Sequence, residues 1–356
     1  MDDVLLIDGS YGEGGGQILR TSLAFSALLG RPVRITKIRA RRPRPGLQPQ
    51  HLACVQALQR ITNARVRGAA LDSMELEFVP RGIRGGTYTI NIGTAGSVTL
   101  LLQCLVLPLL FAPEPSNLRI IGGTDVEHAP TYDYFANVFV PWVSRMGASV
   151  SVRLKRRGYY PKGGGEVVIS IQPVSKLSPI RLERFEEPSV IRGISHAGAL
   201  PEHVAVRQAE AASKRLESAG YDADIDVVMY SRSEVLCPGS GITLWTENMP
   251  IGASSLGAKG VLAEVVGKRA ANYLIHQLDA KRPVDMHMAD QLIPYMAIAD
   301  GVSILRATEA TMHLVTNLWV VERFLGVSAD VQREERRSVV VKLRGVGFKV
   351  EKEEQG

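Results

Sequence analysis

The chain has 356 residues, 45% of them hydrophobic and 22% charged, with a formal net charge of +6. These values are typical of a globular protein with a sizeable core, long enough for two domains. The most apolar stretch, residues 98–113, is interrupted by Gln103 and Pro108 and is too short to cross a bilayer, and the N-terminus lacks the basic start and apolar run of a signal peptide. We therefore expect a cytoplasmic protein without a membrane partner.

In chain order, the same pattern of elements recurs three times. Hydrophobic residues at helical spacing predict helices at residues 16–30, 50–62, 98–112, 132–147, 292–301 and 311–326. Short apolar or alternating runs predict strands at residues 4–9, 33–40, 74–80, 88–93, 117–124, 166–173, 284–288, 303–308 and 338–343. The sequence therefore predicts an α/β fold in which three βαβαβ-like units pack together, each with its helices on one side of a small sheet.

A segment between the second and third units, residues 182–280, breaks this pattern. Strands are expected there at 190–198, 224–230 and 241–247, and helices at 202–220 and 260–280. We interpret this segment as a smaller α/β domain inserted into a large domain, which consists of residues 1–181 and 281–356.

A glycine-rich loop, "GEGGGQILR" at residues 12–20, follows the first strand and begins the first helix. Its glycines allow backbone N–H groups to approach an anion at a helix N-terminus. The loop matches neither the dinucleotide-binding pattern nor the P-loop. Glu13 would repel a phosphate unless a divalent metal stood between them, and Arg20 can reach the same site from the helix. In the alternative interpretation the glycines only permit close packing, and Glu13 is solvated.

A basic stretch, residues 31–44, contains seven basic residues and no acidic one. It is either a solvated loop or a site for an anionic polymer, and its closeness in sequence to the glycine loop favours the second interpretation. Arg39 and Arg42 are expected at the end of a strand, and Gln50 and His51 at the start of the next helix. Because arginines bind phosphate oxygens well, these side chains together predict an anion site. Taken alone, His51 could be a capping residue.

His313 is expected in the first turn of the last long helix, in the position equivalent to His51. A helix N-terminus disfavours the imidazolium form, so the ring would stay neutral and nucleophilic, and it stabilises a phosphate nearby. Asn317, one turn further on, shares the same face and could orient the ring. A lone histidine beside an apolar stripe is, however, more often a core or capping residue.

Three further polar residues are candidates for ligand contacts. Asp290 and Gln291 are expected where the third unit opens and could read a nucleobase or ribose, or Asp290 could cap the helix. Gln103 lies in a very apolar helix. Because a buried amide needs a partner, Gln103 either bonds to nearby backbone or faces a ligand.

Together these sequence blocks resemble the RNA 3'-terminal phosphate cyclase family over nearly the whole chain. The blocks are, in order, DGSYGEGGGQILRT, IRARRPRPGLQPQH, GTAGS, GGTDVEHAPTYDY, PKGGGEV, ADQL and HLVTN. The resemblance implies a large domain of three repeated α/β units with a smaller inserted α/β domain. It also implies an ATP-dependent enzyme of the nucleotidyl-transferring ligase class, active in RNA processing.

The resemblance further implies a mechanism. His313 would attack the α-phosphate of ATP, forming a covalent histidine–AMP and releasing pyrophosphate. AMP would then pass to an RNA 3'-phosphate, and the neighbouring 2'-hydroxyl would attack to give a 2',3'-cyclic phosphate and free AMP. The partners would be ATP and RNA 3'-phosphate ends. The number of associating chains stays open, with a homodimer as one option.

By the same resemblance, each candidate residue has a role. Glu13 would help to hold a Mg or Mn ion. The phosphate and RNA-end site would comprise Arg20, Arg39, Arg42, Gln50 and His51. The nucleotide site would comprise Gln103, Pro130, His287, Met288, Ala289, Asp290 and Gln291. His287 stands where many relatives carry an aromatic residue that stacks on adenine, and imidazole can also stack.

Three other functions compete with this interpretation. A non-catalytic, cyclase-like ribosome-assembly scaffold would lack the histidine nucleophile, so His313 argues against it. An enolpyruvyl transferase is also built from repeated α/β units, but it would need a different phosphate and carboxylate site. A plain RNA-binding protein would explain residues 31–44 without giving a reason for Glu13 and Arg20 to converge with a histidine.

Overall fold

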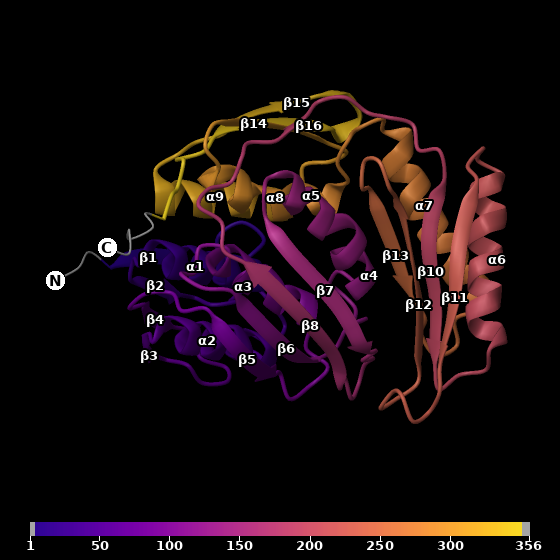
Figure 1. The fold of residues 1–356 in the computed structure, drawn as a ribbon, viewed down its shortest axis with the longest axis horizontal. Helices are drawn as coiled ribbons and strands as arrows, with labels where there is room; N and C mark the ends of the chain where they lie inside the picture. Colours follow the sequence, from indigo (N-terminus) through magenta and orange to yellow (C-terminus); the bar gives the residue numbers. More distant parts are fainter. Residues whose placement is uncertain (1–3, 351–356) are drawn as a thin grey trace.

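The computed structural model describes residues 4–350, and this part of the chain has a mixed α/β fold (Figure 1). Its strands form four sheets of four strands each among the described residues. The expected α/β class is therefore confirmed. The remaining ends of the expected large domain, residues 1–3 and 351–356, lie outside the described residues.

The first sheet has the strand order β1-β2-β4-β3. Its strands are β1 (Leu5–Asp8), β2 (Val33–Thr36), β3 (Arg65–Arg67) and β4 (Leu76–Val79), and the helices of this part of the chain are α1 (Gly16–Leu29) and α2 (Pro49–Thr62). β1 pairs with β2 in parallel, and β2 pairs with β4 in antiparallel orientation. Since Leu5 and Ile7 are buried and Leu6 is exposed, β1 buries one face against the helices.

The second sheet has the order β5-β6-β8-β7. Its strands are β5 (Gly86–Asn91), β6 (Ser116–Gly122), β7 (Ser149–Arg156) and β8 (Gly165–Gln172), and its helical segments are α3 (Val98–Leu109), α4 (Tyr132–Tyr134), the π-helix η1 (Phe135–Phe139) and α5 (Val140–Arg145). The expected helix 132–147 thus changes its hydrogen-bond register before Pro141. Proline has no N–H to donate one turn back, and such a position favours a local change of register.

The third sheet has the order β15-β16-β14-β9. Its strands are β9 (Arg181–Leu182), β14 (Val302–Ala307), β15 (Asp330–Arg333) and β16 (Val339–Arg344), and its helices are α8 (Met286–Ile298) and α9 (Met312–Leu325), with a short 3-10 helix η2 (Glu335–Arg337). The parallel neighbour of β14 is β9, which precedes the expected insertion.

The expected strand at residues 284–288 is wrong. The side chain of Asp285 accepts hydrogen bonds from the backbone N–H groups of His287 (3.0 Å) and Met288 (2.9 Å), so it caps α8 and the chain is helical from Met286. The alternative that Asp290 caps this helix is wrong for the same reason. Asp290 instead lies inside α8, and its side chain accepts a hydrogen bond from Gln17 of α1.

The fourth sheet has the order β11-β10-β12-β13 and stands at one end of the molecule (Figure 1). Its strands are β10 (Ile191–Gly198), β11 (Ala223–Tyr230), β12 (Gly239–Thr246) and β13 (Gly252–Leu256), and its helices are α6 (His203–Glu217) and α7 (Ala263–Asp279). The two helices pack against each other and against this sheet. The strands and helices expected between residues 182 and 280 are therefore present, although Leu182 itself ends β9.

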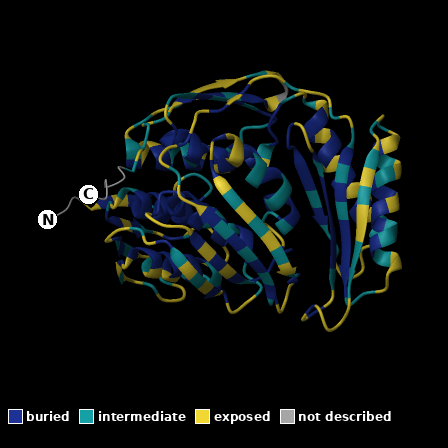
Figure 2. Cartoon of the chain, in the orientation of Figure 1, coloured by how far each residue is buried: buried dark blue, intermediate teal, exposed yellow. Residues whose placement is uncertain are grey.

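Helices α1, α3, α8 and α9 form the interior that lies between the first three sheets (Figure 2). Every residue of α1 from Gln17 to Leu28 is buried, and α3 is buried over most of its length, as expected for so apolar a segment. Helix α1 packs against both α3 and α9. The glycine loop that precedes α1 lies beside the N-terminal part of α9, where Glu13 contacts Thr316. Within residues 4–350, no helix combines the length and apolarity that a membrane span requires.

Candidate active site

The glycine loop between β1 and α1 is seated on α9. Gly12 has a φ of +59°, and a Cβ atom there would lie 2.3 Å from Oγ1 of Thr316. The same Oγ1 accepts a hydrogen bond of 3.1 Å from the backbone N–H of Glu13. Glycine at this position therefore satisfies both the left-handed conformation and the close approach of the loop to the helix. As a result, Glu13 lies beside the N-terminus of α9.

His313 lies in the first turn of α9, as expected, and its ring is held by Gln17 of α1. Nδ1 of His313 hydrogen-bonds with Oε1 of Gln17, and Nε2 of Gln17 donates to Oδ2 of Asp290 at 2.8 Å. Because the amide oxygen can only accept, Nδ1 carries the proton, and Nε2 of His313 keeps its lone pair. The arrangement presents Nε2 as the free nucleophilic atom of the ring.

Asn317 does not orient the ring, contrary to the expectation from the sequence. Its side-chain nitrogen donates to the backbone carbonyl of Asp290 at 2.7 Å, and its oxygen accepts from Thr21 at 2.8 Å. Asn317 thus ties α9 to α8 and α1. Gln17 orients the ring instead. The signal in the sequence was its place in the first turn of α1, three residues before Arg20.

Two titratable groups of the site are neutral near pH 7. Burial, followed by the positive charges of Arg20 and its neighbours, lowers the pKa of His313 to about 4. Burial, reinforced by Asp285 and opposed by Arg20, raises the pKa of Asp290 to about 8. The ring of His313 is therefore neutral at pH 7, with a free lone pair on Nε2, and Asp290 predominantly holds its proton.

Arg20 and His51 converge on Gly16, where α1 begins. A Cβ atom at Gly16 would lie 2.1 Å from Nε2 of His51 and 3.0 Å from Nη1 of Arg20. Nδ1 of His51 accepts a hydrogen bond of 3.2 Å from the backbone N–H of Gln48, so Nε2 carries the proton of the neutral ring. Burial, with Arg20 and Arg39 nearby, lowers the pKa of His51 to about 3. Two side-chain donors thus point to one place at a helix N-terminus.

The guanidinium of Arg20 is buried, with 9% of the residue exposed, and it forms no ion pair with any carboxylate that the structure describes. A buried charge without a counter-ion is costly, since no opposite charge compensates its desolvation. Arg20 is therefore suited to bind an anionic ligand.

Arg42 and Glu13 form an ion pair at the mouth of the site. Contrary to expectation, Arg42 and Arg39 do not end a strand: β2 stops at Thr36, because Lys37 and Arg39 adopt positive φ values of 50° and 52°. Arg39 donates to the backbone carbonyls of Arg44 and Gly46 and so braces the loop.

Glu13 is the candidate ligand for a divalent metal ion, and its Oε1 atom also pairs with Arg42. A Cβ atom at Gly15 would lie 2.1 Å from Oε2 of Glu13, so the glycine leaves the space that this carboxylate occupies. Oε2 is also 4.0 Å from Nδ1 of His313. One carboxylate together with phosphate oxygens of a substrate is a ligand set that suits Mg²⁺.

The expected nucleotide-site residues divide into two groups. Nε2 of Gln103 donates to Oε1 of Gln291 at 2.7 Å, and both amides line a cavity of about 30 Å³ together with Asp290 and Arg20. His287 is exposed, whereas the neighbouring side chains of Met288 and Ala289 are buried in the core.

Two more expected residues anchor loops near the N-terminus of α3. The backbone carbonyl of Pro130 accepts a hydrogen bond of 2.7 Å from Thr99, and Oε1 of Gln50 accepts one of 3.2 Å from the N–H of Ser97. Gln50 thereby connects the start of α2 to the start of α3.

Comparison with known proteins decides the family. The model of the family described as RNA 3'-terminal phosphate cyclase matches residues 11–331. The chain belongs to the RNA 3'-terminal phosphate cyclase family. Relatives with that name from Pyrobaculum neutrophilum, Pyrobaculum aerophilum and Methanopyrus kandleri are 49%, 48% and 47% identical, over 96% of this chain in each case and 99%, 98% and 99% of the relatives. An EPSP synthase structure from Acinetobacter baumannii has a TM-score of 0.31 at 15% identity, covering 98% of this chain and 65% of that chain, and supports no conclusion.

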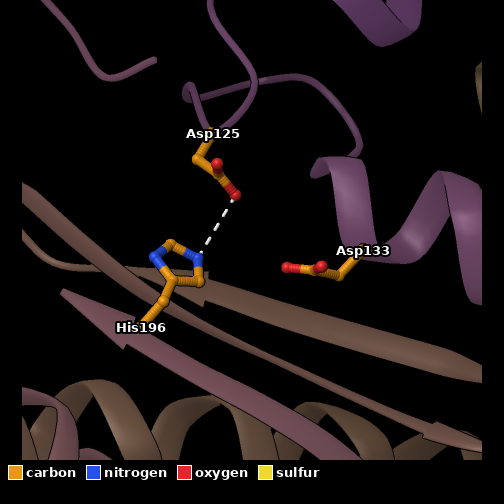
Figure 3. Close-up of side chains that lie close together, drawn as sticks. All are labelled: Asp125, Asp133 and His196. Carbon is orange, nitrogen blue, oxygen red and sulfur yellow. Dashed lines mark ion pairs between the residues drawn. The ribbon is translucent and has the colours of Figure 1, made fainter. Parts of the chain in front are cut away.

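This member of the cyclase family has a second cluster of ionisable side chains, well separated in sequence from Glu13 (Figure 3). Asp125, Asp133 and His196 each offer one atom that could bind a metal ion, and these atoms lie within 4.8 Å of one another. Arg157 already neutralises them: its guanidinium lies 3.1 Å from Asp125 and 2.7 Å from Asp133, while Nε2 of His196 lies 3.3 Å from Asp125.

The guanidinium of Arg157 supplies the positive charge that a metal ion would supply in this cluster. Burial opposes ionisation of Asp125, but Arg157 and His196 outweigh burial and lower its pKa, whereas burial raises the pKa of Asp133. His196 belongs to β10, and the other three residues belong to segments next to the second sheet. The cluster therefore fastens the fourth sheet of this cyclase-family chain to the second sheet.

Proposed function

We propose that the chain converts RNA 3'-phosphate ends to 2',3'-cyclic phosphates in a reaction that consumes ATP and proceeds through a covalent AMP adduct of His313. The observation that carries this proposal is the hydrogen bond from His313 to Gln17, which leaves Nε2 as a free lone pair on a neutral ring. Attack on a phosphorus atom requires a ring nitrogen whose lone pair is not protonated. Membership of the cyclase family and the 47–49% identity to its relatives support the assignment.

In the first step, the lone pair of Nε2 bonds to the α-phosphorus of ATP, and the bond from that phosphorus to the bridging oxygen breaks, so pyrophosphate leaves. The proton on Nδ1 remains on the ring, held by Gln17. In the second step, an oxygen of the RNA 3'-phosphate attacks the same phosphorus, and the P–N electron pair returns to Nε2. In the third step, the 2'-hydroxyl attacks the 3'-phosphorus, loses its proton to solvent, and AMP leaves.

The anion-binding groups have defined places in this scheme. Arg20 and His51 would bind phosphate oxygens at the N-terminus of α1, with Arg42 at the mouth and Arg39 and Gln50 supporting the loops around it. Glu13 would hold a Mg or Mn ion, which when bound neutralises phosphate charge. Pro130, His287, Asp290, Gln291 and Gln103 would border the nucleotide, and Met288 and Ala289 would contribute only through their backbone.

The same proposal includes a domain organisation. The first three sheets, with their helices, would be copies of one unit in a large domain, and residues 182–280 would be an insertion after β9. The four strand orders and the position of the fourth sheet at one end of the molecule support it. A cytoplasmic location and homodimer formation remain predictions.

The deciding experiment is incubation with α-labelled ATP and Mg²⁺ or Mn²⁺ without RNA. Label that survives denaturation, is labile in acid, is stable in alkali and is lost in His313→Asn would support a phosphoramidate at this histidine. Chasing the labelled protein with a 3'-phosphorylated RNA should release AMP and yield a 2',3'-cyclic end. A wild-type protein that stays unlabelled with either metal would refute the proposal.

A further inference from the structure

One face of α9 is apolar, exposed and next to the candidate active site. Met312 and Val315 lie on it with 53% and 37% of their surfaces exposed. Trp319, one turn further, stacks on Tyr11 with a ring separation of 4.2 Å and an angle of 15°, and Tyr11 is itself 39% exposed. We name these four residues the aromatic platform.

The platform is continuous with the candidate site through covalent neighbours. Met312 directly precedes His313, and Tyr11 lies two residues before Glu13. Thr316, on the same helix, accepts the hydrogen bond from the backbone of Glu13. A polymer whose end reaches His313 therefore lies next to the platform.

Positive charge borders the platform on the side of the glycine loop. Side-chain carbons of Arg41 lie 3.4 and 3.6 Å from the position a Cβ atom of Gly14 would take, and Arg41, Arg42 and Arg44 are all exposed. These arginines belong to the segment 31–44, which contains no acidic residue. Aromatic rings beside a basic loop are the combination that binds single-stranded nucleic acid, because bases stack on the rings and phosphates pair with the cations.

We propose that the aromatic platform binds the nucleotides that precede the 3' end of the RNA, with a base stacked on the Tyr11–Trp319 pair and the backbone along Arg41. This inference rests on the proposed function for the identity of the polymer. It adds a contact with the body of the RNA to the contacts with its terminal phosphate. Because every base has a π-face, the contact would select single-stranded ends rather than a particular sequence.

The test is the affinity of 5'-fluorescent, 3'-phosphorylated oligoadenylates of two nucleotides and of about ten, measured by anisotropy without ATP. The wild-type protein should bind the longer RNA more tightly. In Trp319→Ala and Tyr11→Ala, affinity for the longer RNA should fall about fivefold or more, which is the effect of losing one stacked base. Trp319→Phe keeps an aromatic ring and should retain most of the affinity.

Tyr273→Ala is the matched control, since Tyr273 is an exposed aromatic residue on α7, with 54% of its surface accessible. It should bind both RNAs as the wild type does. Unchanged affinity of Trp319→Ala and Tyr11→Ala for the longer RNA would overturn the inference. So would a change confined to the sedimentation of the variants, which would make the platform a contact between copies of this chain.

The proposed function and the RNA-binding role of the platform can be refuted separately. If wild-type protein incorporates label from ATP while both alanine variants bind RNA normally, the platform is wrong and the proposed function stands. If the variants lose affinity for the longer RNA while wild-type protein never incorporates label, the platform is an RNA-binding surface and the adenylylation chemistry is wrong.

Discussion

His313 and Gln17 are joined by a hydrogen bond between Nδ1 of the imidazole and Oε1 of the amide, and the nitrogen of the same amide donates to Asp290. In this arrangement the amide oxygen faces the histidine and the amide nitrogen faces Asp290. An amide, unlike a carboxylate, does not take the Nδ1 proton. The pair therefore keeps one tautomer of His313 while Nε2 forms and breaks its bond to phosphorus.

Replacing Gln17 by leucine should slow the formation of the labelled AMP adduct about 100-fold, because the nucleophile loses its orientation. Gln17→Asn, with a shorter amide, should be intermediate. Nitrogen NMR of His313 provides a readout that a loss of stability would not produce: in the folded variants, the Nδ1-protonated form should no longer predominate. A wild-type spectrum dominated by the Nε2-protonated form would contradict the assignment.

The rate of adduct formation should depend little on the ionisation of His313 above pH 5. Its pKa is lowered to about 4, so the ring loses its proton well below neutrality and regains it only as the pH falls through that value. A single-turnover pH profile with α-labelled ATP should be flat from about pH 7 to 5 and fall below pH 5. A midpoint near 6.5, the ordinary value for histidine, would show that burial and Arg20 do not act as described.

Asp290→Asn should change how stability depends on pH. The pKa of Asp290 is raised from 3.8 to about 8, so between these values the folded state holds a proton that the unfolded state has lost. The free energy of unfolding therefore decreases as the pH rises through this window. Asparagine cannot ionise, so the variant does not have this loss. The stability of the variant relative to wild type should therefore be greater at pH 8 than at pH 4. Thermal unfolding measures this difference, and an equal stability difference between variant and wild type at the two pH values would contradict the raised pKa.

Arg42→Ala should weaken binding of 3'-phosphorylated RNA and reduce its salt dependence. Removing one phosphate contact lowers the slope of log K against log salt by about 0.7 on single strands. Arg184→Ala is the control variant, because Arg184 borders a different cavity, beside Trp142 and Pro283. Titration at several salt concentrations measures the slope, and an unchanged slope in Arg42→Ala would remove this arginine from the RNA-end site.

Arg157→Met should be strongly destabilising. It leaves the buried carboxylates of Asp125 and Asp133 without their cation (Figure 3), and breaking such a pair costs about 3–5 kcal/mol. Arg119→Met removes an arginine from a surface pair with Glu166 and should cost about 1 kcal/mol or less. Urea unfolding compares them, and equal losses in the two variants would show that the buried cluster does not fasten the sheets.

Periodicity determined much of the secondary structure, because apolar residues must face a core whatever their partners are. The helices at α1, α2, α3 and α9 lie close to their expected places. Expected elements failed where a local feature overrides the pattern. Asp285 caps a helix within an apparent strand, Pro141 forces a register change, and positive φ values end β2 early. Strands β3, β7, β9, β13 and β15 were missed; all five lie at the edges of their sheets, and all but β7 are five residues or shorter.

The sequence by itself also predicted one phosphate site: residue types and spacing grouped Glu13, Arg20 and His51, and the resemblance to the cyclase family added His313. Only the tertiary structure decided that Gln17, rather than Asn317, orients the histidine. Asn317 is one turn away on the same helix, but its polar atoms are used by α1 and α8, whereas Gln17 reaches His313 across a contact between helices 296 residues apart in sequence. Hydrogen bonds join groups that packing brings within reach, and spacing along the chain does not contain that information.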